Sequence, residues 1–248
     1  MTVVASRELR DGEIVFVGIG LPNLACNLAR ATHAPGLVLI YESGAVGAVP
    51  DRLPVSIGDP SLVTGSLMAT GMADIFQLFL QGGRIEVGFL GGAQIDRFGN
   101  INTTVVGDYA HPKVRLPGSG GAAEIATHAR RTLIISRLST RAFPAEVDFI
   151  TSPGNWSRGR SRREWGMPGA GPVKVITDRG VLVASEADGE MELAAVYPEM
   201  TAEDVTSRVG WPLRVRARLD TIDPPSAEEL RLLRDVLDPG KLYLKGGG

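Results

Sequence analysis

Apolar residues recur along the chain with two periods, which together predict alternating strands and helices. Short apolar runs at 13–17 and 37–41 have the length and composition of buried strands. Between them, residues 21–31 carry apolar side chains at helical spacing, and Pro22 suits the first turn of a helix. A strand, a glycine turn, a helix and a second strand form a βαβ unit, so the two strands are expected to be parallel.

The rest of the chain continues this alternation, with no internal repeat and no linker that would divide it. Helices are expected over 73–81, over 201–208, where Thr201 and Asp204 approach a capping box, and over 226–236. Further strands are expected at 84–90, 133–136, 173–177, 181–185 and 192–197, and a long polar loop at 157–172. The pattern predicts a single α/β domain over residues 1–248, an open and mainly parallel sheet with flanking helices.

Composition narrows the functional classes. The chain has 248 residues, 44% of them hydrophobic, and a formal net charge of −2, so no global basic field attracts nucleic acid. The single cysteine, Cys26, excludes an intrachain disulfide and is expected to be inert core. No apolar run is long enough to span a bilayer, and the charged N-terminus does not resemble a signal peptide. We expect a soluble, cytoplasmic protein.

Glu42 stands where a buried strand meets a glycine-rich loop. A carboxylate at such a position costs free energy unless something binds it or uses it. It also lies at the carboxyl end of a predicted strand, which is where ligands sit in open α/β sheets. The residue types alone leave three roles open for Glu42: structural, metal-ligating or nucleophilic.

Two glycine turns could present backbone N–H groups to a ligand. Gly18 and Gly20 precede a predicted helix, but Asn23 occupies the third glycine position of a dinucleotide fingerprint. Residues 118–122 form a second glycine turn before a helix, with N–H groups that could bind an oxyanion. On local grounds, a plain helix-entry turn explains each of them equally well.

Other polar segments give weaker signals. The stretch 91–102 reads as a turn-rich hairpin, and the three scattered histidines offer no metal-ligand spacing. No nucleophile-elbow pattern of a serine hydrolase occurs. The arginine run at 158–163 is expected to be a solvated loop, with contact to a phosphate or a partner as the alternative.

Four segments in a fixed order carry a resemblance to a known family: VFVGIGLP at 15–22, YESGAVGA at 41–48, FLGGAQIDRFGNINTT at 89–104 and PGSGGAAEIA at 117–126. Together they resemble the β subunit of family I CoA-transferases, of the 3-oxoadipate or glutaconate type. The similarity continues to residue 205 and therefore spans nearly the whole chain. It implies the CoA-transferase β-subunit fold (NagB/RpiA-like).

The resemblance also implies a role for each matching residue. Glu42 would be the nucleophile that attacks an acyl-CoA thioester and passes through an anhydride to a glutamyl-CoA thioester. A carboxylate needs no separate base at neutral pH, and positioning can supply roughly 7–11 kcal/mol. The backbone N–H of Gly121, with Gly120 adjacent, would stabilise the oxyanion. The implied substrate and CoA contacts are Gly18, Gly20, Ser43, Gly44, Gly91, Gln94 and Asn100.

The implied enzyme moves CoA between an acyl-CoA and a short acid, a dicarboxylic one such as 3-oxoadipate or glutaconate being favoured. CoA thioester is its substrate, and no permanently bound cofactor or metal is expected. A separate α subunit is needed, as a heterodimer, α2β2 or larger assembly, with no nucleic-acid or membrane partner. The alternatives are a CoA-thioester hydrolase or lyase on the same scaffold, or a non-catalytic ligand-sensing module, which would not need Glu42.

Overall fold

A computed structural model describes residues 1–244, which form two compact units. Unit 1 contains residues 1–89 and 224–244, and unit 2 contains residues 90–223. The sequence shows no linker at either junction, so the single domain expected over residues 1–248 stays a prediction. Within residues 1–244, none of the helices has the length and apolar character needed to cross a membrane.

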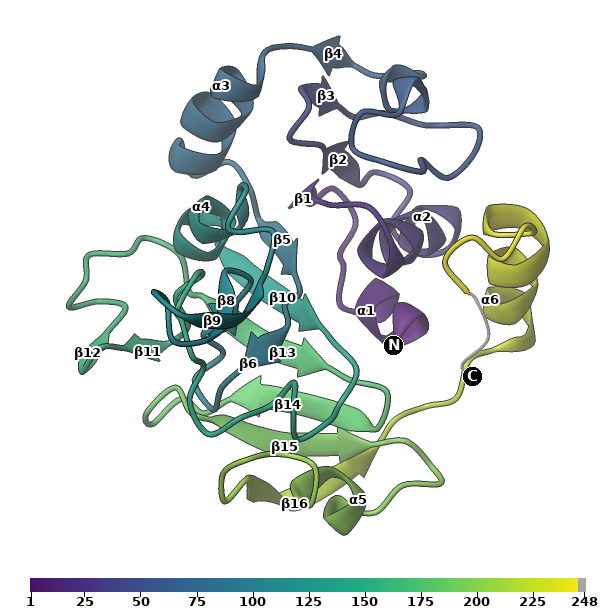
Figure 1. Cartoon of the computed structure of the whole chain (residues 1–248). Helices are drawn as coiled ribbons and strands as arrows, with labels where there is room; N and C mark the ends of the chain where they lie inside the picture. Colours follow the sequence, from purple (N-terminus) through teal and green to yellow (C-terminus); the bar gives the residue numbers. More distant parts are fainter. Residues whose placement is uncertain (245–248) are drawn as a thin grey trace. The chain divides into compact units, whose positions relative to one another are not determined.

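Unit 1 is an open sheet with helices, ordered β5-β1-β2-β3-β4 (Figure 1). The pairs β1–β2 and β1–β5 are parallel, while β3 and β4 add antiparallel pairs at one edge. Its strands are β1 (Ile14–Phe16), β2 (Val38–Ile40), β3 (Ala45–Val46), β4 (Met68–Ala69) and β5 (Val87–Leu90). Its helices are α1 (Thr2–Arg7), α2 (Leu21–Ala31), η1 (Pro60–Val63), α3 (Met72–Asp74), η2 (Ile75–Gln81), α6 (Ala227–Arg231) and η3 (Leu232–Leu237).

Unit 2 is built on a second run of paired strands, ordered β10-β13-β14-β15-β16. The pairs β10–β13 and β15–β16 are parallel, and the two pairs between them are antiparallel. These strands are β10 (Arg131–Ile135), β13 (Pro172–Ile176), β14 (Gly180–Ala184), β15 (Met191–Val196) and β16 (Arg214–Thr221), and the helices are α4 (Ala122–His128) and α5 (Ala202–Thr206).

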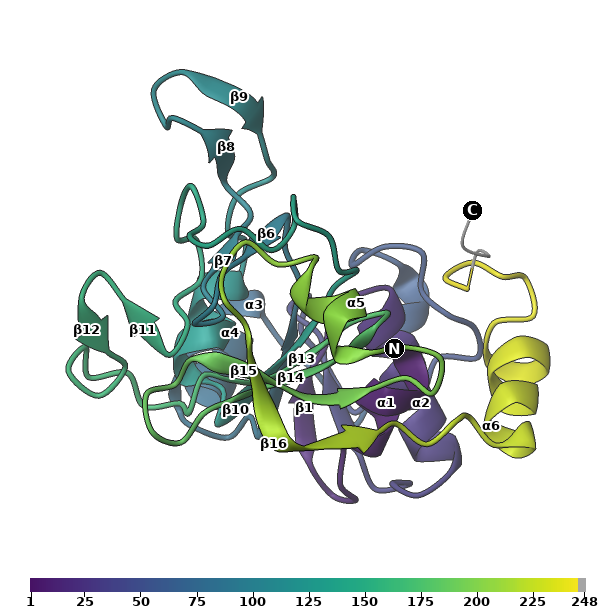
Figure 2. The ribbon, with the colours of Figure 1, turned by 90° about the horizontal axis from the view of Figure 1, so that it is seen from below.

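Three small hairpins complete unit 2, and Figure 2 shows the one formed by β8 and β9 projecting from it. The hairpin strands are β6 (Gln94–Ile95), β7 (Ile101–Asn102), β8 (Val105–Gly107), β9 (Pro112–Arg115), β11 (Trp156–Ser157) and β12 (Arg160–Ser161).

The α/β fold class and the parallel β1–β2 pair are confirmed. The capping boxes at Thr201 and Ser226 both form, because each hydroxyl accepts a backbone N–H and each partner carboxylate accepts in return. Cys26 is fully buried, and burial raises the pKa of its thiol, as an inert core residue requires. The hairpin expected at 91–102 forms from β6 and β7. The pattern missed α1, the short strands β3, β4, β8, β9, β11 and β12, and β16, which has no buried residue to create a hydrophobic signal.

The expectation that the arginine run at 158–163 is a solvated loop is wrong for Arg162. The neighbouring Arg160 and Arg163 are exposed, but Arg162 is only 7% exposed. Burial lowers the pKa of Arg162 to about 10. Its guanidinium donates hydrogen bonds of 2.7–3.3 Å to the backbone carbonyl oxygens of Ala126, Thr127, Pro153, Gly154 and Gly169. Arg162 therefore ties the polar loop to the last turn of α4.

We expect Arg162→Met to lower the free energy of unfolding by about 2 kcal/mol or more, because it leaves several buried carbonyl groups without donors. Arg163→Met is the matched control, since Arg163 is exposed, and should change stability by less than about 0.5 kcal/mol. Denaturant unfolding monitored by circular dichroism measures both. Equal effects of the two substitutions would contradict a structural role for Arg162.

Candidate active site

Glu42 occupies a tight turn directly after β2. The Gly44 N–H donates to the Tyr41 carbonyl and the Tyr41 N–H to the Ala45 carbonyl, both at 3.0 Å, so the chain reverses around Glu42. Gly44 is required here twice over. Its φ is +111°, which disfavours any other residue, and a β-carbon would collide with the Thr70 carbonyl oxygen. The turn is therefore fixed by backbone geometry.

The Glu42 side chain is half-buried and has no bonding partner. Among residues 1–244, no hydrogen bond or ion pair reaches its carboxylate. The adjacent Ser43 is exposed and its hydroxyl is likewise unpaired in this part of the chain. A carboxylate held in a rigid turn without a structural partner is available to a ligand, which argues against a purely structural role for Glu42.

The residue before Glu42 is anchored in the core of unit 1. The Tyr41 hydroxyl accepts a 2.6 Å hydrogen bond from Asn23 Nδ2, and both side chains are completely buried. Asn27 donates in turn to the Asn23 side-chain oxygen at 3.0 Å. This chain of amides connects α2 to the Glu42 turn. Sequence reasoning noted Asn23 only as a missing glycine, although a polar residue on the apolar face of a helix was a usable signal.

Gly18 and Gly20 lie beside the Glu42 turn, as the parallel strands require. Val17 N donates to the Ile40 carbonyl at 3.0 Å, so the ends of β1 and β2 lie at one edge of the sheet. Gly20 has a φ of +102° and begins α2, whereas Gly18 is exposed and has open space where a β-carbon would stand. The structure thus brings together the candidate residues of unit 1, which are Gly18, Gly20, Glu42, Ser43 and Gly44.

Tyr243 bonds to the loop that follows β3, a contact that was not foreseen from the sequence. The Tyr243 hydroxyl donates to the Pro54 carbonyl. Burial raises the pKa of Tyr243, and the nearby Gly20 backbone opposes that rise. The Asp238 carboxylate fixes the segment by accepting backbone N–H groups of residues 242–244 at 2.6–2.9 Å. Tyr243 and Gly20 lie near opposite ends of the chain, so no local pattern could pair them.

In unit 2, the turn before α4 leaves two backbone donors unused. Ala122 N bonds to the Ser119 carbonyl at 2.9 Å and Gly118 N to Thr103, but the N–H groups of Gly120 and Gly121 have no acceptor within residues 1–244. Gly120 has a φ of +47°, which favours glycine. Gly121 has a φ of −79°, which any residue adopts, so the backbone conformation does not explain glycine at 121.

The side chains of Gln94 and Asn100 form hydrogen bonds that hold the hairpin of β6 and β7. Gln94 is buried, donates to Asp148 at 3.0 Å and accepts from Asn102 at 2.6 Å. Asn100 is buried too, and its amide oxygen accepts from the Gly154 N–H at 2.8 Å. These bonds supply a structural reason for both amides, and their contact with substrate stays a prediction. Gly91 is exposed immediately after β5.

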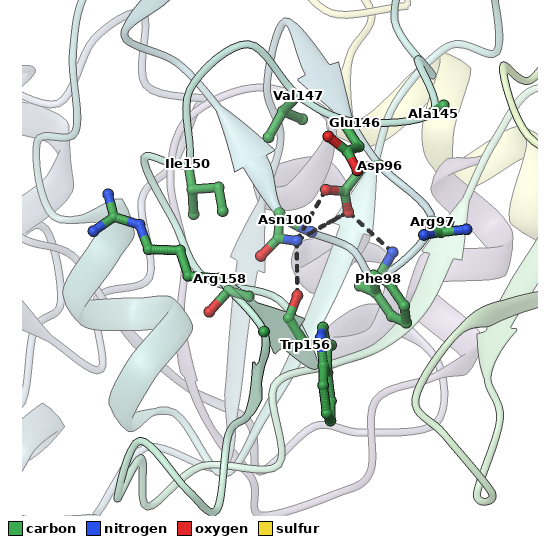
Figure 3. A pocket seen from close by; sticks show the side chains of 12 residues that line it. Asp96, Arg97, Phe98, Asn100, Ala145, Glu146, Val147, Ile150, Trp156 and Arg158 are labelled. Atoms are coloured by element: carbon green, nitrogen blue, oxygen red, sulfur yellow. Dashed lines mark hydrogen bonds between the residues drawn. The ribbon is translucent and has the colours of Figure 1, made fainter.

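Asn100 also borders a cavity of about 400 Å³ in unit 2 (Figure 3). Its amide nitrogen donates to the Asp96 carboxylate at 2.9 Å and to the Trp156 carbonyl at 2.9 Å. Burial raises the pKa of Asp96, against the lowering effect of the Asn100 hydrogen bond. The Asp96 carboxylate therefore closes the hairpin turn through its hydrogen bonds. No cluster of three or more histidine, cysteine or acidic residues within residues 1–244 could hold a metal ion.

Comparison with known proteins places this site in context. Residues 1–208 match the family model described as Coenzyme A transferase. The chain is 49% identical over 234 residues to the β subunit of 3-oxoadipate CoA-transferase from Pseudomonas knackmussii, and the match covers 94% of this chain and 90% of that protein. It is 36% identical over 249 residues to the β subunit of glutaconate CoA-transferase from Acidaminococcus fermentans, with 98% and 92% covered.

A solved structure agrees with these matches. The crystal structure of glutaconate coenzyme A-transferase from Acidaminococcus fermentans superimposes with a TM-score of 0.90 and 34% sequence identity. The alignment covers 99% of this chain and 96% of that chain. The similarity therefore includes both units and the C-terminal residues beyond the family model.

We expect Gly44→Ala to lower the free energy of unfolding by about 1–3 kcal/mol, because the added methyl group is strained at positive φ and meets the Thr70 carbonyl. Gly18→Ala is the matched control: it lies at the same edge with open space, and should change stability by less than about 0.5 kcal/mol. Thermal and denaturant unfolding measure both variants. If Gly44→Ala is as stable as the control, the turn is not held as described.

Proposed function

The chain belongs to the coenzyme A transferase family, and from that premise we propose that it is the glutamate-bearing β subunit of a heteromeric CoA-transferase. It moves CoA from an acyl-CoA to a short dicarboxylic acid with the help of a separate α subunit. The observation that carries the proposal is the unpartnered Glu42 carboxylate, fixed at the carboxyl end of β2 by a turn that only glycine at 44 permits.

Each half-reaction exchanges one group on Glu42. A carboxylate oxygen of Glu42 attacks the thioester carbonyl, the C–S bond breaks, and an acyl-glutamyl anhydride and CoA thiolate result. The thiolate then attacks the glutamyl carbonyl, which releases the first acid and leaves CoA as a thioester on Glu42. A second acid reverses both steps and departs as the new acyl-CoA. No proton is transferred, so no histidine base is needed.

We assign a Gly121 N–H to the oxyanion of these carbonyl attacks, with Gly120 beside it. Both backbone donors lack an acceptor within residues 1–244, and glycine at 121 is not demanded by its own φ of −79°. A donor placed where negative charge develops contributes about 2.7–4 kcal/mol in a comparable enzyme.

For the accepting acid we propose 3-oxoadipate first and glutaconate second. The 49% identity to a 3-oxoadipate CoA-transferase subunit exceeds the 36% identity to a glutaconate CoA-transferase subunit. Both acids carry a second carboxylate, so each offers the enzyme a charged handle away from the reacting end.

We expect Glu42→Gln to lower CoA transfer by on the order of a thousandfold or more, since the positioned nucleophile supplies most of the rate. Asp51→Asn is the control, because Asp51 is an exposed carboxylate in the loop that follows. Transfer is measured with the assembled αβ enzyme, succinyl-CoA and 3-oxoadipate or glutaconate. In parallel, release of free CoA is measured without an acceptor acid. Hydrolysis of succinyl-CoA in place of CoA transfer would contradict the assignment as a transferase.

Gly121→Val tests the oxyanion donor separately. The φ of −79° accommodates valine, so the variant should keep its folded-state circular dichroism while the side chain obstructs the N–H. We expect turnover to fall by about a hundredfold or more. If a folded Gly121→Val enzyme keeps the wild-type kcat, residues 118–122 form a plain helix-entry turn with no catalytic role.

A further inference from the structure

Unit 2 contains a hollow of about 360 Å³ between the β8–β9 hairpin and the loop that follows β10. Its charged lining residues are two arginines, and no acidic residue among residues 1–244 borders it. The cavity beside Asn100, in contrast, is bordered by two arginines and two acidic residues. The hollow is called here the arginine pocket, and the residues of its lining that matter below are Gln94, Leu116, Ser136, Arg137, Ser139 and Arg141.

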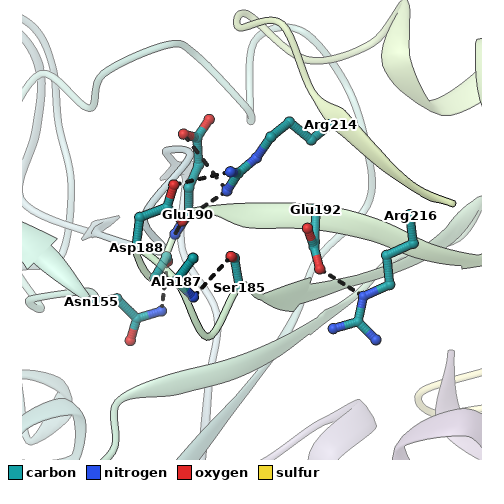
Figure 4. Close-up of polar contacts among 9 residues, drawn as sticks. Asn155, Ser185, Ala187, Asp188, Glu190, Glu192, Arg214 and Arg216 are labelled. Carbon is teal, nitrogen blue, oxygen red and sulfur yellow. Dashed lines mark hydrogen bonds and ion pairs between the residues drawn. The ribbon is translucent and has the colours of Figure 1, made fainter.

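The two arginines of this pocket have no partner in the chain. Arg137 and Arg141 are exposed, and neither guanidinium makes an ion pair or a hydrogen bond within residues 1–244. Arg214, another exposed arginine of unit 2, donates to both oxygens of Asp188 at 2.8 and 3.0 Å (Figure 4). Guanidinium groups bind carboxylates and phosphates through paired N–H groups in this way. Arg137 and Arg141 therefore keep all their donors available for an anion from outside the described chain.

The loop that carries both arginines has a fixed backbone. Ser136 N donates to the Ile176 carbonyl at 3.1 Å, and Phe143 N donates to the Ser139 carbonyl at 2.9 Å. Leu138 and Phe143 are buried, so an apolar side chain anchors the loop near each arginine. Because the backbone is already ordered, binding an anion requires only the two arginine side chains to be immobilised.

The acidic residue Asp148 bonds to the lining of the pocket but not to its arginines. The Asp148 carboxylate accepts hydrogen bonds from Gln94 Nε2 at 3.0 Å and from the Gly107 N–H at 2.8 Å. Gln94 is only 7% exposed, and its amide oxygen accepts from Asn102 at 2.6 Å. The polar groups of the two hairpins thus satisfy one another, and the positive charge of the pocket is left without a counter-ion from them.

One wall of the pocket continues into the turn that holds the proposed oxyanion donor. Leu116 borders the pocket, and its N–H donates to the Thr104 carbonyl at 2.9 Å. The glycine turn begins two residues later, where Gly118 N donates to the Thr103 carbonyl at 2.7 Å. Five residues of chain separate Leu116 from Gly121, so their Cα atoms lie at most about 18 Å apart. An anion in the pocket is therefore within the reach of an extended substrate that reacts at this turn.

From these observations we propose that the arginine pocket binds an anionic group of the substrate that is remote from the reacting carbonyl. The proposal rests on the proposed function, which supplies two such groups: the second carboxylate of the dicarboxylic acid and the phosphates of CoA. Both present oxygen atoms in the arrangement that a guanidinium binds. Anchoring such a remote group helps to place the reacting carbonyl.

The test measures steady-state CoA transfer from succinyl-CoA to 3-oxoadipate by the assembled αβ enzyme. In Arg137→Gln combined with Arg141→Gln, we expect kcat/KM for at least one substrate to fall by about tenfold or more through a raised KM, because hydrogen bonds to a charged group are lost. The kcat should change by less than about threefold, since a remote anchor contributes binding. Circular dichroism verifies folding.

Arg160→Gln combined with Arg163→Gln is the matched control. It removes the same charge from exposed positions of unit 2 and should change each kinetic constant by less than about threefold, because distant surface charges are screened at physiological salt.

The two sources of the anion are distinguished by which substrate is affected. If the pocket binds the carboxylate, kcat/KM for 3-oxoadipate falls. If it binds the phosphates, kcat/KM for succinyl-CoA falls while the value for 3-oxoadipate is unchanged, because in a ping-pong reaction the acid meets an enzyme that already carries CoA.

Three outcomes would overturn the proposal: unchanged constants in the folded double variant, equal losses in the control, and a lower kcat without a raised KM. The proposed function is tested separately, since it fails if the wild-type αβ enzyme transfers no CoA or if Glu42→Gln transfers it at the wild-type rate with both arginines intact.

Discussion

The backbone hydrogen bonds that reverse the chain between Tyr41 and Ala45 are the constraint on which the remaining features of unit 1 depend. They place a glutamate at the carboxyl end of a buried strand and require glycine at 44. The buried Asn23–Tyr41 hydrogen bond anchors one side of this turn and Thr70 anchors the other. The core therefore uses its polar groups to orient the turn, and leaves the carboxylate itself without a partner in residues 1–244.

A fixed turn backbone that carries an unpartnered carboxylate is suited to covalent catalysis by Glu42. A carboxylate without a salt bridge keeps its charge available for attack on a thioester, whereas an ion pair to the attacking oxygen would have to break in every cycle. Rigid placement also lowers the entropic cost of attack.

Much of the fold could be predicted from the sequence, because periodic apolar patterns are local. The βαβ unit around α2 and the capped helix at Thr201 follow from short-range rules. Glu42 could be singled out because a charge after a buried strand conflicts with its surroundings. Elements without a burial pattern could not be predicted, as the exposed strand β16 illustrates. Nor could long-range contacts such as Tyr243 with Pro54, or the buried environment of Arg162 within an apparently solvated arginine run.

The central claim is that Glu42 carries CoA covalently during turnover. The assembled αβ enzyme is incubated with succinyl-CoA in the absence of an acceptor acid, digested with a protease at mildly acidic pH, and examined by mass spectrometry. The account predicts that the peptide containing Glu42 gains the mass of CoA less one water, and that adding the acceptor acid removes this label. Turnover with a CoA adduct on another residue, or turnover without any covalent intermediate, would contradict it.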